Sequence, residues 1–246
     1  MMNISNVDPT EKAAFSDLKI FRKLAEQRHV TLEAFGSSNT QRRLPGMTWF
    51  DYVELGFKQK YGNGCGTFIN AGIGGDTTSM MLARFERDVL TFKPDLVIIT
   101  AGGNDSNPVH NVSREQYREN LLEIHRRISS YGGEVIFQTY YAVHKEQLAP
   151  EMAGRMDSNM ETVREVAAET GAFLQDNYLR WNRMRDRFPA VYSLLMLDAM
   201  HVCADGNAII GIDMLRNFGI GLPENFAREC GIGFLGQALL DALSVE

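Results

Sequence analysis

The sequence predicts an α/β fold in which helices cover both faces of a parallel sheet. Short apolar runs alternate along the chain with longer segments of helical periodicity. Such alternation is typical of βαβ units, whose strands run parallel. The chain has 246 residues, 44% of them hydrophobic, which suits one domain with a sizeable core. We therefore expect residues 1–246 to form a single domain.

The N-terminal elements follow from capping residues and apolar runs. A helix is expected over residues 8–27, because Asp8 suits a cap and Pro9 suits the first helical position. Residues 30–35 form an apolar run that predicts the first strand. Thr48 is expected to cap a helix that reaches Tyr61.

The middle of the chain contains the clearest strand. Residues 67–71 predict the second strand, and a helix is expected over residues 78–90. Pro94 separates this helix from residues 95–100, an apolar run typical of a strand buried on both faces. A capping box that opens at Ser113 predicts a helix to about residue 131.

The C-terminal elements continue the alternation. Residues 134–139 predict a fourth strand, and a helix over residues 150–170 should end at Gly171. Residues 172–175 predict a short fifth strand. The remainder is expected to be mostly helical, with a last helix that ends near Leu243.

Charge and composition argue against several classes of protein. Lysine and arginine total 25 and aspartate and glutamate total 31, and the basic residues are scattered, so neither nucleic acid nor a membrane surface is an expected partner. The three cysteines show no metal-ligand spacing, and reduced thiols fit them best. No apolar signal-peptide core or membrane span is found in the sequence, so we expect a cytoplasmic protein.

Four short segments carry polar groups that ester hydrolysis needs. Three of them follow the first three predicted strands, where ligands bind in parallel sheets. The segments are Phe35-Gly36-Ser37-Ser38-Asn39-Thr40, Gly72-Ile73-Gly74-Gly75-Asp76-Thr77, Gly102-Gly103-Asn104-Asp105 and Asp198-Ala199-Met200-His201.

Ser38 is a candidate nucleophile, and the last segment offers it a base. A serine hydroxyl needs a neighbouring base to take its proton. The spacing of Asp198 and His201 lets the carboxylate reach imidazole Nδ1–H and leaves Nε2 free for the serine. Taken alone, Ser38 is better explained by a turn or a helix cap, and the acid–imidazole pair is equally well explained by surface residues before a helix.

Two further residues could bind the oxyanion of a tetrahedral intermediate together with the backbone N–H of Ser38. Gly75 lets the backbone turn tightly and present its N–H, and Asn104 can offer its side-chain amide. A nucleotide-binding glycine loop and an Asx turn are the alternatives. Thr77 stands where a dinucleotide fingerprint requires its last glycine, which weakens the nucleotide alternative.

In this order, the four segments resemble the signature blocks of the SGNH hydrolases, also called the GDSL esterase/lipase family. The resemblance implies a three-layer α/β/α sandwich on a five-stranded parallel sheet, flavodoxin-like, without a metal or organic cofactor. By position, it implies Ser38 as nucleophile, His201 as base, Asp198 as its orienting acid, and Gly75 and Asn104 in the oxyanion hole. The family usually has Asp before the nucleophile, whereas this chain has Ser37, which makes Ser37 a fallback nucleophile.

The expected activity is that of a serine esterase that cleaves short acyl esters through an acyl-enzyme. Acetyl esters of carbohydrates are the leading substrate by family analogy, so the partner is a small-molecule or glycan ester. A thioesterase, a lysophospholipase and a non-catalytic carbohydrate-binding module remain alternatives. Four residues are expected to line the substrate pocket: His110, Tyr140, His144 and Met200. The alternatives are a surface-loop position for the two histidines and ordinary packing for Tyr140 and Met200.

Overall fold

A computed structural model describes residues 13–43 and 46–221 of the chain. Its centre is a five-stranded sheet with the order β2-β1-β3-β4-β5, in which every neighbouring pair is parallel. The strands are β1 (Val30–Gly36), β2 (Gly66–Gly72), β3 (Leu96–Thr100), β4 (Glu134–Gln138) and β5 (Phe173–Gln175). The five-stranded parallel sheet is confirmed, and each strand lies within one or two residues of its predicted place.

The strands end in register, which brings the loops that follow them to one edge of the sheet. Gly36 pairs with Gly72 on one side and with Thr100 on the other. Thr100 pairs with Gln138, and Gln138 pairs with Gln175. Segments far apart in the sequence therefore meet beyond these ends, as parallel sheets require.

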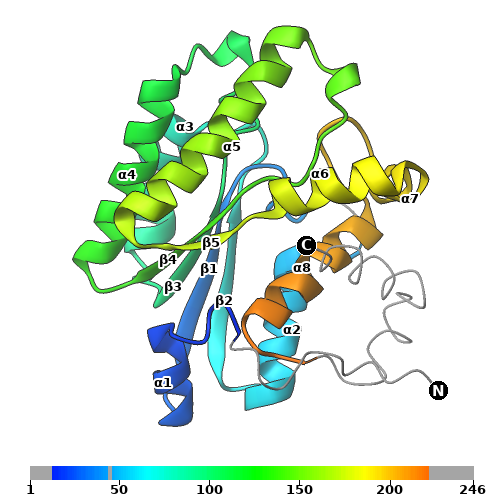
Figure 1. Ribbon diagram of the computed structural model, residues 1–246. Helices are drawn as coiled ribbons and strands as arrows, with labels where there is room; N and C mark the ends of the chain where they lie inside the picture. The colour runs from blue at the N-terminus through cyan, green and yellow to red at the C-terminus, as the bar shows by residue number, and fades with distance from the viewer. Residues whose placement is uncertain (1–12, 44–45, 222–246) are drawn as a thin grey trace, which may run out of the picture.

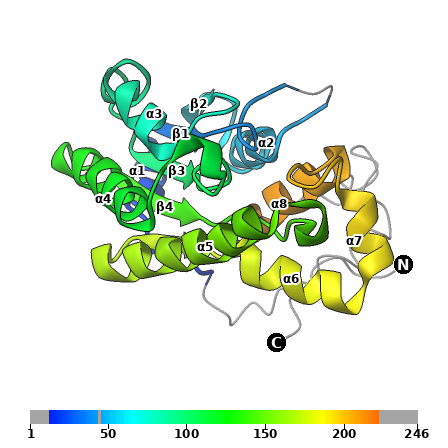
Figure 2. The same cartoon turned by 90° about the horizontal axis from the view of Figure 1, so that it is seen from above.

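Helices form a layer on each face of the sheet (Figures 1 and 2). One hydrophobic core joins the sheet to α1 (Lys19–Ala25), α2 (Trp49–Tyr61), α6 (Asn177–Arg187), α7 (Pro189–Leu195) and α8 (Ala204–Asn217). The other core joins it to α3 (Thr78–Ala83), α4 (Arg114–Ser130) and α5 (Pro150–Thr170). Three short turns, η1 (Glu86–Leu90), η2 (Pro108–His110) and η3 (Lys145–Gln147), complete the described elements. The predicted three-layer sandwich is confirmed.

The strand β3 shows why its sequence is apolar throughout. Leu96 and Ile98 belong to one core, whereas Val97 and Ile99 belong to the other. Side chains alternate between the faces of a strand, so a strand covered on both faces needs apolar residues at every position.

Several helix boundaries agree with their capping signals. Thr48 and Asp51 form a reciprocal capping box at the start of α2. Gly171 adopts a left-handed conformation, with φ of 68°, directly after α5. Ser113 caps α4 by accepting the backbone N–H of Gln116 at 3.1 Å.

Two predicted helices differ from the structure. The helix expected over residues 78–90 ends at Ala83, and a π-turn, η1, follows it. The break coincides with Arg84, whose guanidinium is buried and donates to the carbonyls of Gly36 and Ala71 at the strand ends. Of the helix expected over residues 8–27, only Lys19–Ala25 is helical among the described residues, and residues 8–12 lie outside them. The predicted C-terminal helix near Leu243 also lies outside the described residues.

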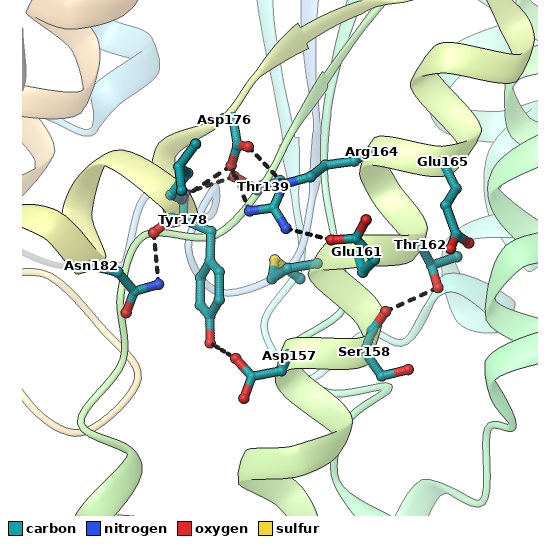
Figure 3. A network of polar contacts seen from close by, with 12 residues as sticks. Thr139, Asp157, Ser158, Glu161, Thr162, Arg164, Glu165, Asp176, Tyr178 and Asn182 are labelled. Carbon is teal, nitrogen blue, oxygen red and sulfur yellow. Dashed lines mark hydrogen bonds and ion pairs between the residues drawn. The ribbon is translucent and has the colours of Figure 1, made fainter. Parts of the chain in front are cut away.

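A polar network fixes α5 against the start of α6 (Figure 3). Arg164 of α5 donates to both carboxylate oxygens of Asp176, at 2.6 and 3.1 Å. Asp176 also accepts the hydroxyl of Thr139 at 3.1 Å, and Thr139 accepts the backbone N–H of Tyr178 at 2.9 Å. Because Thr139 directly follows β4, these bonds help to set the path of the loop after that strand.

Two observations concern compartment and redox state. Within the part of the chain that the structure describes, no helix has both the length and the apolar composition to cross a bilayer. Cys65 and Cys203 are free thiols, and Cys230 lies outside the described residues.

Candidate active site

The loop after β1 presents a serine to a histidine from the other end of the chain. Ser38 Oγ lies 2.9 Å from His201 Nε2, although the two residues are 163 positions apart. The loop turns sharply, since the carbonyl of Ser37 accepts the backbone N–H groups of Thr40 and Gln41. Gly72 permits this turn: a Cβ there would stand 2.3 Å from the backbone nitrogen of Gln41. The structure thus brings the predicted nucleophile and base within proton-transfer distance.

Asp198 holds the imidazole from the opposite side. His201 Nδ1 lies 2.9 and 2.8 Å from the two oxygens of the Asp198 carboxylate. The backbone N–H groups of Met200 and His201 also donate to Asp198 Oδ1, each at 2.8 Å. Burial opposes ionisation of Asp198, but the Met200 N–H and the His201 ring together lower its pKa below the usual value. The carboxylate therefore favours a proton on Nδ1 and leaves Nε2 to face the serine.

The neighbouring hydroxyl, Ser37, has a different environment. It is fully buried, and its Oγ lies 2.9 Å from the hydroxyl of Tyr140. Among the described residues, no histidine is hydrogen-bonded to Ser37, and His201 bonds to Ser38. The fallback hypothesis of Ser37 as nucleophile is therefore not supported by this geometry.

The predicted oxyanion-hole groups lie at the ends of the first three strands. Gly75 has a φ of 87°, a conformation that glycine adopts readily, and it lines the cavity in front of Ser38. Asn104 Nδ2 donates to the carbonyl of Asp76 at 2.9 Å, which leaves its second amide hydrogen unused. Among the described residues, no acceptor is found for the backbone N–H of Ser38 or Gly75. The N–H groups of Ser38 and Gly75 and one amide hydrogen of Asn104 are thus available to a ligand.

Arg84 ties the glycine turn to the strand ends. Its Nε donates to Asp76 Oδ2 at 2.6 Å, and its NH2 donates to the Gly36 carbonyl at 2.9 Å. The guanidinium also stacks over the ring of Phe35, 4.6 Å from the centroid. The backbone carbonyl of Asp76 in turn accepts a hydrogen bond from the side-chain amide of Asn104. One buried arginine therefore supports both the Asn104 amide and the glycine turn.

Tyr141 joins the nucleophile loop to the histidine loop. Its hydroxyl lies 2.6 Å from both Asn39 Oδ1 and the Met200 carbonyl, and it accepts the backbone N–H of Val202 at 3.1 Å. The residue is almost fully buried. The sequence offered only a pair of aromatic residues after a strand, which predicts packing or stacking, so this connection required the fold.

A cavity of about 340 Å³ opens in front of the serine–histidine pair. It is lined by Ser38, Asn39, Gln41, Arg43, Gly74, Gly75, Gly103, Asn104, Tyr140, Met152, Met200 and His201. A smaller cavity of about 30 Å³ shares Ser38, Asn39, Gln41, Arg43 and His201 with it. Tyr140 and Met200, two of the residues expected to line the substrate pocket, are thus placed at this cavity.

His110 and His144, which were also expected to line the pocket, border neither of these two cavities. The imidazole of His144 packs on the ring of Tyr192 and bonds to Glu146 through Nδ1 at 2.9 Å. His110 ends the turn η2, beyond the residues that reach the cavity. A position after a strand places a residue near the correct edge of the sheet but does not orient its side chain.

No metal-binding cluster is found in the described part of the chain, where no three His, Cys, Asp or Glu side chains gather as ligands would. The groups gathered around Ser38 are those that acyl transfer uses: a hydroxyl, an imidazole, a carboxylate and several N–H groups.

Comparison with known proteins agrees with this geometry. The sequence model of the GDSL-like Lipase/Acylhydrolase family matches residues 34–209, a range that contains every predicted catalytic and oxyanion residue. An acetylxylan esterase of Geobacillus stearothermophilus is 27% identical over 177 residues, which cover 68% of this chain and 75% of that protein. The uncharacterized lipoprotein YqeF of Bacillus subtilis (strain 168) is 35% identical over 117 residues, 43% of this chain and 46% of that protein.

Solved structures share the fold. A variant of Axe2, an acetyl xylan esterase from Geobacillus stearothermophilus, superposes with a TM-score of 0.67 at 25% identity, over 79% of this chain and 97% of that one. LAE5, an alpha/beta hydrolase enzyme from the metagenome of Lake Arreo, Spain, gives a TM-score of 0.66 at 24% identity, over 78% and 95% of the chains. Catalytic mutants of Axe2 replace a serine, a histidine and an aspartate three positions before that histidine.

Proposed function

Because the chain belongs to the GDSL-like lipase/acylhydrolase family and hydrolyses esters, we propose that it removes acetyl groups from carbohydrates through Ser38, His201 and Asp198. The observation that carries the proposal is the 2.9 Å contact between Ser38 Oγ and His201 Nε2. The carboxylate behind the imidazole supports the same assignment, since it would stabilise the imidazolium formed during the reaction.

In the first half of the reaction, His201 Nε2 takes the proton of Ser38 as the serine oxygen attacks the ester carbonyl. The carbonyl oxygen becomes an oxyanion, which accepts hydrogen bonds from N–H groups of Ser38, Gly75 and Asn104. The intermediate then collapses: the bond to the alcohol oxygen breaks, and His201 returns the proton to the leaving alcohol. An acetyl-serine remains.

Water completes the cycle by the same route. His201 removes a proton from the water as its oxygen attacks the acetyl carbonyl. The second tetrahedral intermediate expels the serine oxygen, which recovers its proton from His201. Acetate leaves, and the starting hydrogen bonds form again.

Two observations support a short acyl group on a polar alcohol. The cavity of about 340 Å³ has polar residues such as Gln41 and Asn104 in its wall, and its apolar side is limited to a few side chains, including Met152 and Met200. Relatives in two of the comparisons are acetylxylan esterases. An acetyl ester on a sugar hydroxyl combines a small acyl group with such an alcohol.

A covalent probe tests the catalytic assignment. We expect a fluorophosphonate to label wild-type protein at Ser38 and to leave Ser38→Ala unlabelled. Ser37→Ala is the matched control, because it removes the adjacent hydroxyl, and it should still be labelled. Labelling at Ser37, or no labelling of folded protein, would contradict the proposal.

Substrate profiles separate the remaining alternatives. We expect p-nitrophenyl acetate and acetylated xylo-oligosaccharides to be cleaved faster than p-nitrophenyl octanoate or acyl thioesters. A preference for the octanoate or the thioester would favour a lysophospholipase or thioesterase instead. Sugar binding without any turnover would favour a non-catalytic binding module.

A further inference from the structure

The cavity wall is rich in hydrogen-bond donors and carries one permanent charge. Arg43 lines both the large and the small cavity, and no aspartate or glutamate is among the described residues that line either. Within the described parts of the chain, the guanidinium of Arg43 has no hydrogen-bond or ion-pair partner, although the other arginine of the same loop, Arg42, pairs with Asp51.

Gln41 adds a second donor at the same place. Its Oε1 accepts the backbone N–H of Gly74 at 3.0 Å, so the amide orientation is set by the glycine turn. The NH₂ group of Gln41 has no acceptor in the described part of the chain. Gln41 also lines both cavities, so the side chains of Gln41 and Arg43, both hydrogen-bond donors, border the same space.

The carboxylates on adjoining segments are already engaged. Asp51 accepts the backbone N–H and the hydroxyl of Thr48 as well as the Arg42 guanidinium. Asp198 is held by His201 and two backbone N–H groups. Neither is therefore left over to neutralise Arg43, an exposed residue that lines both cavities.

The position of Arg43 suggests which part of an ester it would contact, namely the alcohol part. Gly75 and Asn104, which would bind the oxyanion, line only the large cavity. Arg43, Ser38 and His201 border both cavities. The small cavity therefore adjoins His201, which would deliver the proton to the leaving alcohol, and is bordered by Arg43 but by neither oxyanion-binding residue, so it suits the alcohol part of the ester.

We infer that Arg43 and Gln41 form a carboxylate-binding subsite, and that the enzyme favours acetyl esters whose alcohol part is anionic, such as an acetylated uronic acid. This inference rests on the proposed function. Arginine suits the role because its planar fork matches a carboxylate with two parallel hydrogen bonds.

A pair of acetyl esters that differ in one charge tests the subsite. 4-Acetoxybenzoate carries a carboxylate on its leaving group, and methyl 4-acetoxybenzoate is the neutral equivalent. We expect Arg43→Gln to lower kcat/KM for the anion about 5–10-fold relative to the neutral ester, mainly through KM. The corresponding loss of binding free energy lies between that of a solvent-exposed ion pair and that of a desolvated ion pair. The effect should shrink in about 0.5 M NaCl, because salt screens exposed charges.

Arg42→Gln is the matched control, because it removes the same charge from the neighbouring residue of the loop. It should leave the ratio of the two esters unchanged. If Arg43→Gln does not alter the ratio, or if Arg42→Gln alters it equally, the subsite is refuted even though both esters are cleaved through Ser38.

Binding to the inactive variant gives an answer that does not need turnover. In Ser38→Ala, adding Arg43→Gln should weaken binding of 4-acetoxybenzoate by a similar factor and leave the methyl ester unaffected. Equal binding of the anion with and without Arg43 would overturn the inference. Retention of full activity by Ser38→Ala would instead overturn the proposed function.

Discussion

Replacing Glu33 by glutamine should remove a large pH dependence of stability. Glu33 lies in the middle of β1, is fully buried, and neither of its carboxylate oxygens has a hydrogen-bond partner among the described residues. Burial, reinforced by the negative charge of Asp88 and opposed by Arg84, raises the pKa of Glu33 to about 8. Glutamine has the same shape and cannot ionise.

The sign of the effect follows from the two pKa values. In the unfolded chain the carboxyl titrates near 4.5, so between that pH and about 8 the folded protein holds a proton that the unfolded chain has lost. Stability therefore falls as pH rises through this window and is constant above it. At 1.36 kcal/mol per pH unit, ionisation of this carboxyl in the unfolded chain lowers the stability of the folded protein by about 3 kcal/mol at pH 7.

Urea unfolding at several pH values measures this term. The free energy of unfolding of Glu33→Gln minus that of the wild type should rise by about 3–4 kcal/mol between pH 5 and pH 8. Any constant cost of the buried amide cancels in this difference. Glu86→Gln, which changes an exposed glutamate, should give a flat difference. If Glu33→Gln follows the wild type at every pH, the assigned burial and ionisation of Glu33 are wrong.

Two further predictions concern the geometry around the serine. Tyr141→Phe should lower kcat about 10-fold with KM nearly unchanged, because the nucleophile and histidine loops lose their shared hydroxyl. Tyr192→Phe is the control, because it removes a comparable buried hydrogen bond, to the Ala142 carbonyl at 2.9 Å. It should lower the free energy of unfolding without lowering kcat. Equal losses of kcat in the two variants would contradict a positioning role for Tyr141. Asn104→Ala should lower kcat by about 10²–10³ with the circular dichroism spectrum preserved, and an unchanged kcat would remove Asn104 from the oxyanion hole.

The sheet and most helices were predictable because their signals are local. Apolar runs gave the five strands, and the caps at Thr48 and Gly171 gave two helix ends that agree with the structure. The resemblance to the SGNH hydrolases added the order of the strand-end segments. Together these predicted that Ser38 and His201 would meet.

The remaining features depend on contacts that a single sequence does not encode locally. The interruption after Ala83 arises where Arg84 reaches two strand ends. Tyr141 connects loops that lie about 100 and 60 residues away from it. His144 follows a strand, as predicted, but its ring packs on Tyr192. Residues after a strand can be assigned to an edge of the sheet, whereas their orientation depends on neighbours that come from elsewhere in the chain.

The cytoplasmic location stays a prediction. Its basis was the polar N-terminal sequence, and one of the relatives carries the name of a lipoprotein. Fractionation of cells that produce the protein, followed by detection of the chain, would decide between the cytosol and a membrane fraction.

Where the resemblance to the SGNH hydrolases implies an aspartate before the nucleophile, this chain has Ser37, whose hydroxyl lies 2.9 Å from that of Tyr140. Burial raises the pKa of Tyr140 above its usual value, so the phenol stays protonated well into alkaline solution. The turn that carries Ser38 is consequently anchored by a link that acid or moderate base leaves unaltered. Loss of turnover at either extreme of pH would then have its origin outside the support beneath the reacting oxygen.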